Sequence, residues 1–443
     1  MIKNNYGVVK INADGDIYFD DISLKKITDT YESPFFLMSE NQLRNNYNEF
    51  LKAFSKIPNF EIFYSVKTNF ESEVLKTLKD MGCGAEISGG QDFLATQKAG
   101  FHTNKIIFDG PCKTQKEIND TIDKKIHCLN IESIHEANKI EQIASEKNVK
   151  INVGIRIDPL VDKNYYDVII DTYKRKFGFP INTACEAAEI IKNCPHLNLM
   201  AIHMHIGSQI TNTIMYVNAI NKAFEFISTL KKKNIIIEEL NIGGGYPAQS
   251  IRNIRLSRRL KLAQIIEKFG IKLEKKIPSI IDFGEEITKA YKINSQKYNI
   301  YPKIITEPGR SIVSDISVIV GKLKVIKENW AFADFGVNDL AENMFFAERD
   351  FGIPGKMTQK FTKKINISGP TLSTADVIYL NVDVPELTPN DTIAIFDAGA
   401  YSIPRSTQFT QPRKAVYFIT KNKQIKLIRS QETYEDVLKN QIW

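Results

Sequence analysis

Residues 61–69 read EIFYSVKTN, and this stretch decides how the rest of the chain is interpreted. Its apolar run predicts a β-strand that ends at Lys67, directly before a polar turn. A lysine at a strand end either carries its charge into water or takes part in chemistry. In the second case burial lowers the pKa of the amine, which can then attack a carbonyl carbon and form a Schiff base.

From Glu61 onward, short β-rich runs alternate with amphipathic helical patterns such as those at 133–147 and 211–233. The expected strands cover 61–66, 84–88, 104–108, 126–131, 150–157, 197–206, 237–242 and 303–307. Strands that alternate with helices in this way predict a closed parallel (β/α)8, TIM-like barrel of the α/β class. An extended run at Phe35–Met38 and a helix-like stretch from Glu40 precede it.

The pattern changes after about residue 312, where strands follow one another with few helices between them. Strands are expected at 318–325, 365–367, 377–380, 392–396 and 415–419, and they predict a C-terminal all-β domain. The early runs 8–11 and 17–19, separated by Asp14-Gly15, predict a hairpin that joins this domain. We therefore expect N-terminal strands of the β domain at 1–33, the barrel at 34–312 and the C-terminal β domain at 313–443.

The connection from 246 to 304 is long for a barrel of this kind and contains helical patterns near 255–268 and 283–291. It is interpreted either as a lid or dimer contact or as surface decoration. The densest basic run, Arg252–Lys261, alternates with Ile and Leu, which favours the wet face of a helix over a rim that attracts an anionic substrate.

Composition is ordinary for a globular protein and gives no sign of a nucleic-acid or membrane partner. The chain has 443 residues, is 43% hydrophobic and 25% charged, and carries a formal net charge of +7. No basic run is interleaved with aromatic residues as in nucleic-acid binders, and no apolar stretch spans a bilayer or forms a signal segment. The five cysteines show no disulfide or zinc spacing. We expect a cytoplasmic protein without nucleic-acid or membrane partners.

The strand ends collect the residues that carry chemistry. Lys67 ends the first expected strand, HMHIGSQ (203–209) the sixth, the glycines 243–245 the seventh, and EPGRS (307–311) the eighth. Active groups of parallel barrels gather at the C-terminal ends of the strands. These segments are therefore expected to meet at one end of the barrel.

The glycines at 243–245 let backbone N–H groups approach an anion, and barrels bind phosphate in the loops after strands seven and eight. Arg310 adds a bidentate clamp for such a group. His203 and His205 are candidate metal ligands, but no further Cys or Asp has ligand spacing, so no metal is expected. A histidine stacked on a flat aromatic cofactor explains the pair better.

A phosphate site, a carbonyl-seeking lysine, a stacking histidine and the carboxylate of Glu307 together describe a site for pyridoxal 5'-phosphate. A carboxylate beside the pyridine nitrogen keeps that nitrogen protonated and makes the ring a strong electron sink. Glu307 therefore favours decarboxylation over racemisation.

At this point the chain resembles the pyridoxal-phosphate-dependent decarboxylases of the diaminopimelate and ornithine decarboxylase group, which have the alanine-racemase-like fold (fold type III). The resemblance runs from about Ser33 to Tyr417. It is carried in order by YSVKTN (64–69), GAEIS (84–88), KFG (176–178), HMHIGS (203–208), IGGG (242–245), EPGRS (307–311) and GAY (399–401).

The resemblance implies a role for each matching residue. Lys67 would form the Schiff base, His205 would stack on the ring and Glu307 would pair with the pyridine nitrogen. The other cofactor-binding residues, which mainly hold the phosphate, would be Ser208, Gly244, Gly245, Gly309, Arg310 and Tyr401. Relatives of this kind are homodimers whose active sites are completed by residues of the partner's β domain.

The chain departs from the family at the substrate side. The family carries a cysteine that delivers a proton two residues after a Gly-Pro pair, followed by an acidic residue; here GPTLSTAD (369–376) has Leu372 and Ser373 at these positions. In diaminopimelate decarboxylases an arginine follows the Asn-Asp-Leu element, and here residues 341–343 are Ala-Glu-Asn.

Each lost charged contact costs about 1.5–3 kcal/mol, and two such losses weaken selection for diaminopimelate by roughly a hundredfold or more. We therefore expect a different substrate. Asp334, Ser373 and Asp376 are candidate substrate contacts, although either aspartate is equally well explained as a turn cap.

The leading hypothesis is a homodimeric amino-acid decarboxylase of a specialised, siderophore-type pathway, acting on ornithine, another diamino acid or an amino-acid–citrate conjugate. One alternative is a diaminopimelate decarboxylase of lysine biosynthesis. A second is a non-catalytic, antizyme-like relative, which Lys67 disfavours because such relatives usually lose the lysine.

Overall fold

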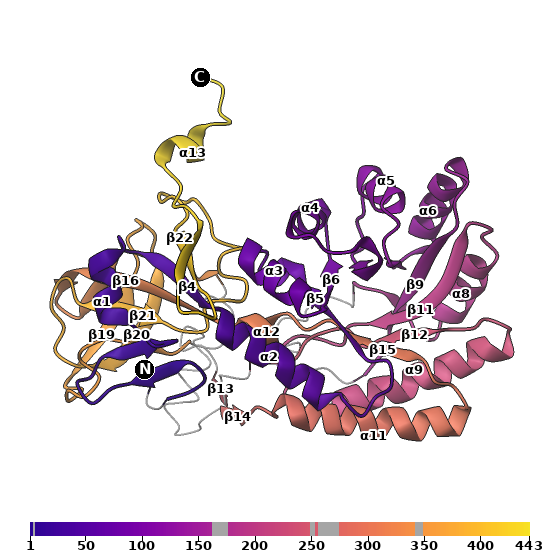
Figure 1. The fold of residues 1–443 in the computed structure, drawn as a ribbon, viewed down its shortest axis with the longest axis horizontal. Helices are drawn as coiled ribbons and strands as arrows, with labels where there is room; N and C mark the ends of the chain where they lie inside the picture. The colour runs from indigo at the N-terminus through magenta and orange to yellow at the C-terminus, as the bar shows by residue number, and fades with distance from the viewer. Residues whose placement is uncertain (3–4, 162–175, 249–252, 256–273, 342–348) are drawn as a thin grey trace. The chain divides into compact units, whose positions relative to one another are not determined.

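In the computed structural model, residues 1–2, 5–161, 176–248, 253–255, 274–341 and 349–443 are described (Figure 1). The chain forms two units. One contains residues 47–247 and 277–311 and is called the barrel unit below. The other contains residues 1–46 and 312–443 together with two short strands, β13 (Asn253–Arg255) and β14 (Glu274–Lys276), and is called the sheet unit.

The barrel unit is built around a closed ring of parallel strands. Along the ring the neighbours are β9, β11, β12, β15, β5, β6, β7 and β8, and β8 pairs with β9 to close it. Their bounds are β5 (Glu61–Ser65), β6 (Gly84–Ile87), β7 (Ile106–Phe108), β8 (Cys128–Ile131), β9 (Ile151–Asp158), β11 (Leu197–Met204), β12 (Glu239–Asn241) and β15 (Lys303–Thr306). The two-residue β10 (Phe179–Pro180) pairs with β9. The predicted barrel is confirmed, with each strand at its expected place.

Helices lie on the outside of the strands (Figure 1). They are α3 (Ser72–Asp80), α4 (Gly90–Ala99), α5 (Gln115–Asp123), α6 (Ile134–Glu146), α8 (Ala184–Lys192), α9 (Ile214–Lys232) and α11 (Ile280–Tyr298), with 3-10 turns η1 (Val66–Thr68) and η2 (Thr103–Lys105). Local chemistry sets several starts. Thr114 caps α5 with Glu117, and Ser279 caps α11 with Asp282, each in a reciprocal capping box.

The long connection before β15 contributes a regular barrel helix. The pattern near 283–291 belongs to α11, which packs beside α9 (Figure 1). Asn294 Nδ2 donates to Asn221 Oδ1 across this contact at 2.7 Å. The expected helix at 255–268 and the basic run Arg252–Lys261 lie outside the described residues, except for their part in β13.

The sheet unit holds a mostly antiparallel sheet in the order β20-β19-β17-β16-β4-β22-β23, and β21 pairs with β16 and β18. Their bounds are β4 (Phe35–Ser39), β16 (Ser317–Lys327), β17 (Trp330–Ala333), β18 (Phe351–Gly352), β19 (Lys363–Ser368), β20 (Val377–Val384), β21 (Thr392–Ile395), β22 (Ala415–Ile419) and β23 (Ile425–Arg429). The helices of this unit are α1 (Leu24–Thr30), α12 (Arg310–Val313), which begins at the end of the barrel unit, and α13 (Tyr434–Leu438); α2 (Glu40–Ala53) crosses from one unit to the other.

The expected barrel boundary at residue 34 is corrected by β4. This strand pairs antiparallel with β16 and parallel with β22, and all of its residues are buried. It is therefore a central strand of the sheet unit, and the division lies near residue 46.

The N-terminal strands join the core of the sheet unit without joining its main sheet. β1 (Val9–Ile11), β2 (Ile17–Phe19) and β3 (Ile22–Ser23) form a separate antiparallel sheet. Their apolar side chains share one hydrophobic cluster with β4, β16 and β22. Among the helices in the described part of the chain, none is long and apolar enough to cross a membrane.

Candidate active site

Lys67 lies in η1, directly after β5, and its amine faces the next strand. Lys67 Nζ lies 2.8 Å and 3.0 Å from the two carboxylate oxygens of Glu86, and it donates to Ser88 Oγ at 2.8 Å. Ser88 Oγ also donates to Glu86 Oε1 at 2.7 Å. The lysine side chain is 46% exposed and the glutamate 1%. The ammonium is therefore neither surrounded by water nor buried: it is held at the barrel rim by a buried carboxylate.

The strand end that carries Lys67 is held in place by buried neighbouring residues. Tyr64 donates its hydroxyl to the backbone oxygen of Asn69 at 3.0 Å, and both Thr68 and Asn69 are buried. Gly309, after β15, passes so close to η1 that a Cβ there would overlap with Thr68 Oγ1. The position of Lys67 is therefore set both by η1, which follows β5, and by the loop after β15.

The glycine loop after β12 packs against the loop after β11. Gly243 and Gly245 have φ of +66° and +103°, which side-chain-bearing residues rarely adopt. A Cβ on either would also overlap a backbone oxygen of the β11 loop. Gly244 N donates to His205 Nδ1 at 3.4 Å. The neutral ring therefore carries its proton on Nε2.

The surroundings of His205 favour the neutral imidazole. The surrounding protein desolvates the ring, and the positive charges of Arg156 and Lys67 add to this effect, so the pKa of His205 falls to about 3. The residue nevertheless retains exposed surface. A neutral imidazole with an accessible surface is suited to stack on a flat ring, as predicted for this position.

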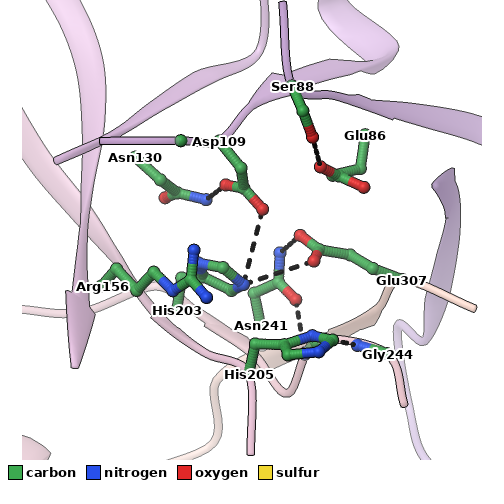
Figure 2. Close-up of polar contacts among 12 residues, drawn as sticks. Glu86, Ser88, Asp109, Asn130, Arg156, His203, His205, Asn241, Gly244 and Glu307 are labelled. Carbon is green, nitrogen blue, oxygen red and sulfur yellow. Dashed lines mark hydrogen bonds and ion pairs between the residues drawn. The ribbon is translucent and has the colours of Figure 1, made fainter. Parts of the chain in front are cut away.

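Glu307 follows β15 and belongs to a buried polar cluster inside the barrel (Figure 2). Asn241 Nδ2 donates to Glu307 Oε1 at 2.5 Å, and His203 Nε2 lies 3.3 Å from Glu307 Oε2. The same His203 nitrogen lies 3.6 Å from Asp109 Oδ2, and Asn130 Nδ2 donates to Asp109 Oδ1 at 2.6 Å. The two histidines of the HMH stretch thus have different neighbours: His203 lies between carboxylates and His205 beside the glycine loop.

The charges in this cluster shift one another. Burial and the charge of Asp109 raise the pKa of Glu307, against the opposing effect of His203. Burial lowers the pKa of His203, but the two carboxylates outweigh it and the pKa is raised. Burial raises the pKa of Asp109, but the charges of His203 and Arg156 outweigh this effect, so the pKa is lowered.

Arg156 on β9 supplies the nearby fixed positive charge. Its Nη1 donates to Glu132 Oε1 at 2.9 Å, and Gly178 N donates to the other oxygen of Glu132 at 3.0 Å. The guanidinium lies 4.8 Å from the ring centre of Phe177. The KFG motif at 176–178 therefore positions this arginine.

Sequence reasoning missed the roles of several residues in the site, namely Glu86, Ser88, Asp109, Asn130, Arg156 and Asn241. The signal was present, because Asp109 directly follows β7 and Asn241 ends β12. Applying the strand-end rule to every strand, rather than to four of them, would have found both.

The remaining predicted residues are placed as follows. Ser208 is exposed in the loop after β11, and Arg310 begins α12. Tyr401 lies in the sheet unit with a φ of +54°. The three candidate substrate contacts also lie in the sheet unit.

Both candidate aspartates have structural partners. Asp376 is 1% exposed and accepts from Val337 N at 2.9 Å, from Thr371 N at 2.9 Å and from Thr371 Oγ1 at 2.6 Å. Asp334 accepts from Lys322 N and from Ser33 Oγ, each at 2.9 Å. These contacts favour the turn-anchoring alternative for both.

Ser373 Oγ accepts from Ala375 N at 3.3 Å within the same turn. Its neighbour Leu372 is 100% exposed. The residue that stands in place of the family's cysteine therefore presents a bare hydrocarbon side chain on the surface of the chain.

Comparison with known proteins settles the family. The pyridoxal binding domain of pyridoxal-dependent decarboxylases matches residues 40–314, and their C-terminal sheet domain matches residues 311–399. The chain belongs to the pyridoxal-dependent decarboxylases.

Similarity to individual family members extends over the whole chain. The chain is 29% identical to the diaminopimelate decarboxylase of Aquifex aeolicus over 96% of this chain and 95% of that protein. It is 27% identical to the enzyme of Methanocaldococcus jannaschii over 97% and 95%. The crystal structure of the M. jannaschii enzyme superposes with a TM-score of 0.86 and covers 98% of both chains.

The residues at the strand ends fit the cofactor of this family. The amine of Lys67, held on a carboxylate, could bond to the aldehyde, and His205 could stack on the ring. The turn of glycines could cradle the phosphate, and the buried carboxylate of Glu307 could face the ring nitrogen. The predicted cofactor, lyase class and fold are thus confirmed. The specialised, siderophore-type pathway is not supported, since the relatives named above favour the alternative of diaminopimelate decarboxylation.

Proposed function

We propose that this chain decarboxylates diaminopimelate, releasing carbon dioxide and leaving lysine. The observation that carries the proposal is similarity along the full length to diaminopimelate decarboxylases, which includes both units rather than the barrel alone. One related crystal structure, that of the M. jannaschii enzyme, contains L-lysine, which is diaminopimelate without one carboxyl group.

In this proposal Lys67 would be the residue that bonds to the cofactor aldehyde. Its amine must first lose a proton, and the Glu86 carboxylate at 2.8 Å is a base placed to accept it. Pyridoxal phosphate, when bound, supplies the electron sink that accepts the electrons of the broken carbon–carboxylate bond. Ser88 fixes Glu86 in place through its own hydrogen bond.

His205 and the glycine loop orient the cofactor. The imidazole is neutral, so it stacks on the ring without adding charge, and its Nδ1 is tied to Gly244 N. The loop backbone and Arg310 hold the phosphate, with Ser208 and Gly309 nearby on the neighbouring loops. Glu307 holds a proton at the ring nitrogen.

The proton that replaces the carboxyl group must come from a side chain other than residue 372, because the leucine there has none to give. Lys67 would be the donor, since its amine at the barrel rim could carry a proton to the substrate. We also propose a homodimer, in keeping with the family resemblance, with Tyr401 completing the phosphate site.

Residues 372–373 and 341–343 depart from the family's pattern, and these departures favour a second candidate function, the decarboxylation of another diamino acid. One experiment separates the two. Purified, cofactor-loaded protein is given diaminopimelate, lysine, ornithine or a citrate conjugate of ornithine, and carbon dioxide and the amine product are measured. We expect turnover with diaminopimelate to exceed the others by at least about a hundredfold, the discrimination that unpaired charged groups in a site produce. Faster turnover of ornithine or a conjugate would overturn the proposal.

A further inference from the structure

His203 occupies an unusual position for a histidine: it lies between two carboxylates in the interior of the barrel (Figure 2). Its Nε2 is 3.3 Å from Glu307 Oε2 and 3.6 Å from Asp109 Oδ2, and its side chain is 1% exposed. Among the described residues, neither ring nitrogen has a hydrogen-bond partner of good geometry. One nitrogen therefore serves both carboxylates at ion-pair distance.

One oxygen of each carboxylate, Oε1 of Glu307 and Oδ1 of Asp109, already accepts a hydrogen bond from an amide side chain. Gly243 N donates to Asn241 Oδ1 at 2.9 Å, which orients the amide so that its Nδ2 faces Glu307 Oε1. Asn130 Nδ2 likewise faces Asp109 Oδ1. Each carboxylate thus has one oxygen fixed as an acceptor and the other turned toward His203.

Two carboxylates this close do not both ionise in a buried site without a cation between them. The other charged or titratable groups that act on the cluster come from neighbouring barrel elements: Arg156 from β9, Lys67 from η1, Glu86 from β6 and His205 after β11. Arg156 is bound to Glu132 and Lys67 to Glu86. A protonated His203 is therefore the group placed to balance Asp109 and Glu307.

We propose that His203, held protonated by Asp109, favours the ionised carboxylate of Glu307 and thereby the protonated ring nitrogen of the bound cofactor. The inference rests on the proposed role of Glu307 toward that nitrogen. His203 is a positioning residue rather than a catalytic one, because it acts through Glu307. Without its charge, the proton shared by Glu307 and the ring nitrogen moves toward the carboxylate, and the electron sink weakens.

The readout is the protonation of the ring nitrogen, independent of turnover. The holoenzyme is loaded with pyridoxal phosphate carrying ¹⁵N in the ring, and the ¹⁵N chemical shift is followed by NMR across neutral pH. The variants are His203→Gln, which keeps a donor but has no charge, and Asp109→Asn. His127→Gln is the matched control, because His127 also contacts a glutamate, with its Nε2 2.9 Å from Glu239 Oε2, at the opposite, N-terminal ends of the strands.

Wild type and His127→Gln are expected to show a protonated ring nitrogen. His203→Gln is expected to change the ratio of protonated to unprotonated nitrogen by at least about tenfold, since an opposite charge at this distance shifts a carboxyl pKa by about 1–3 units. Asp109→Asn is expected to make the shift depend on pH, with a midpoint below the ordinary histidine value of about 6.5.

The inference would be overturned if His203→Gln and Asp109→Asn both kept the wild-type ¹⁵N chemical shift at every pH. It would also be overturned if the His127→Gln control changed in the same way as these variants. If His203→Gln does not fold, Asp109→Asn decides alone, because it leaves the imidazole in place. The variant Glu307→Gln distinguishes a failure of the proposed role of Glu307 from a failure of the inference about His203 alone. If it leaves the ring nitrogen unchanged, the proposed role of Glu307 fails and the inference fails with it. If only Glu307→Gln has an effect, the proposed function survives and the inference about His203 is wrong.

Discussion

At the scale of single residues, the site works by placing each charge beside a group that opposes or supports it. Lys67 is paired with Glu86 at the rim, Arg156 with Glu132, and Glu307 with His203 and Asn241 in the interior. His205 is the exception, because desolvation by the surrounding protein lowers its pKa and the positive charges of Arg156 and Lys67 add to this effect.

The neutrality of His205 predicts a pH effect on the stability of the apoprotein. Its pKa of about 3 in the folded state lies below the value of about 6.5 expected in the unfolded chain, so the unfolded chain takes up a proton first as the pH falls. The stability contribution is present above about pH 6.5 and is lost as the pH drops below it. The loss is smaller than the full shift implies, because the residue keeps exposed surface.

His205→Gln is therefore expected to lose less thermal stability than wild type between neutral and mildly acid pH. The control is His135→Gln, an exposed histidine on α6. Melting temperatures at the two pH values are the measurement. Identical pH dependence in wild type and His205→Gln would show that the ring is not held neutral by the fold.

At the scale of elements, glycines let the loops after the barrel strands pack closely against one another. Gly309→Ala is expected to destabilise the protein by about 1–3 kcal/mol, because the added methyl overlaps with Thr68 Oγ1 and forces the loop after β15 away from η1. Weaker cofactor retention should accompany this, since η1 carries Lys67.

Gly89→Ala is the matched control for Gly309→Ala. Gly89 also follows a barrel strand, but the nearest atom to an added Cβ is Glu117 Oε1 at 3.7 Å, an ordinary contact. Urea unfolding and fluorescence of released cofactor give the two readouts. Equal stability of the two variants would contradict the close approach of the loops.

The turn at 369–376 gives a second prediction at this scale. Asp376→Asn is expected to cost about 1.5–3 kcal/mol of folding stability, because an amide group replaces an acceptor that serves three donors. Asp383→Asn, an exposed aspartate on β20, is the control. A raised KM with unchanged unfolding would instead assign Asp376 to the substrate.

The same elements show what could be read from the sequence. Eight barrel strands were predictable because each is a short β-rich run between helical patterns, and strand ends located Lys67, His205 and Glu307. The strand β4 was assigned to the wrong unit, because an apolar run such as Phe35–Met38 does not reveal which sheet it enters. Asp334 is held by Ser33 and Lys322, and Asp376 is held in part by Val337, all distant in sequence, so their anchoring roles could not be separated from substrate binding.

At the scale of the whole molecule, the sheet unit is assembled from both ends of the chain. β4 lies between β16 and β22, so residues 35–39 complete a sheet whose other strands come after residue 312. At this scale the comparisons favour the alternative, diaminopimelate decarboxylation, over the substrate expected from the sequence. Two substitutions in short segments were given more weight than similarity along the entire chain to diaminopimelate decarboxylases.

This assembly predicts that a fragment of residues 313–443 does not fold alone. Without β4, the strands β16 and β22 lose their shared neighbour, and the apolar cluster loses Phe35 and Leu37. Circular dichroism of the fragment should show no cooperative unfolding, and co-expression with residues 1–46 should restore it. Cooperative unfolding of the isolated fragment would show that the sheet does not depend on its N-terminal strand.

The central claim is that Lys67 is the residue that bonds to the cofactor, and one measurement tests it most directly. The holoenzyme is reduced with borohydride, which makes the lysine–cofactor bond permanent, then digested and examined by mass spectrometry. Lys76→Ala, which removes an exposed lysine paired with Glu73 on α3, serves as control beside Lys67→Ala. We expect the pyridoxyl group on the peptide that contains Lys67 in wild type and control, and none in Lys67→Ala. A label on a different lysine, or retention of the label in Lys67→Ala, would contradict the account.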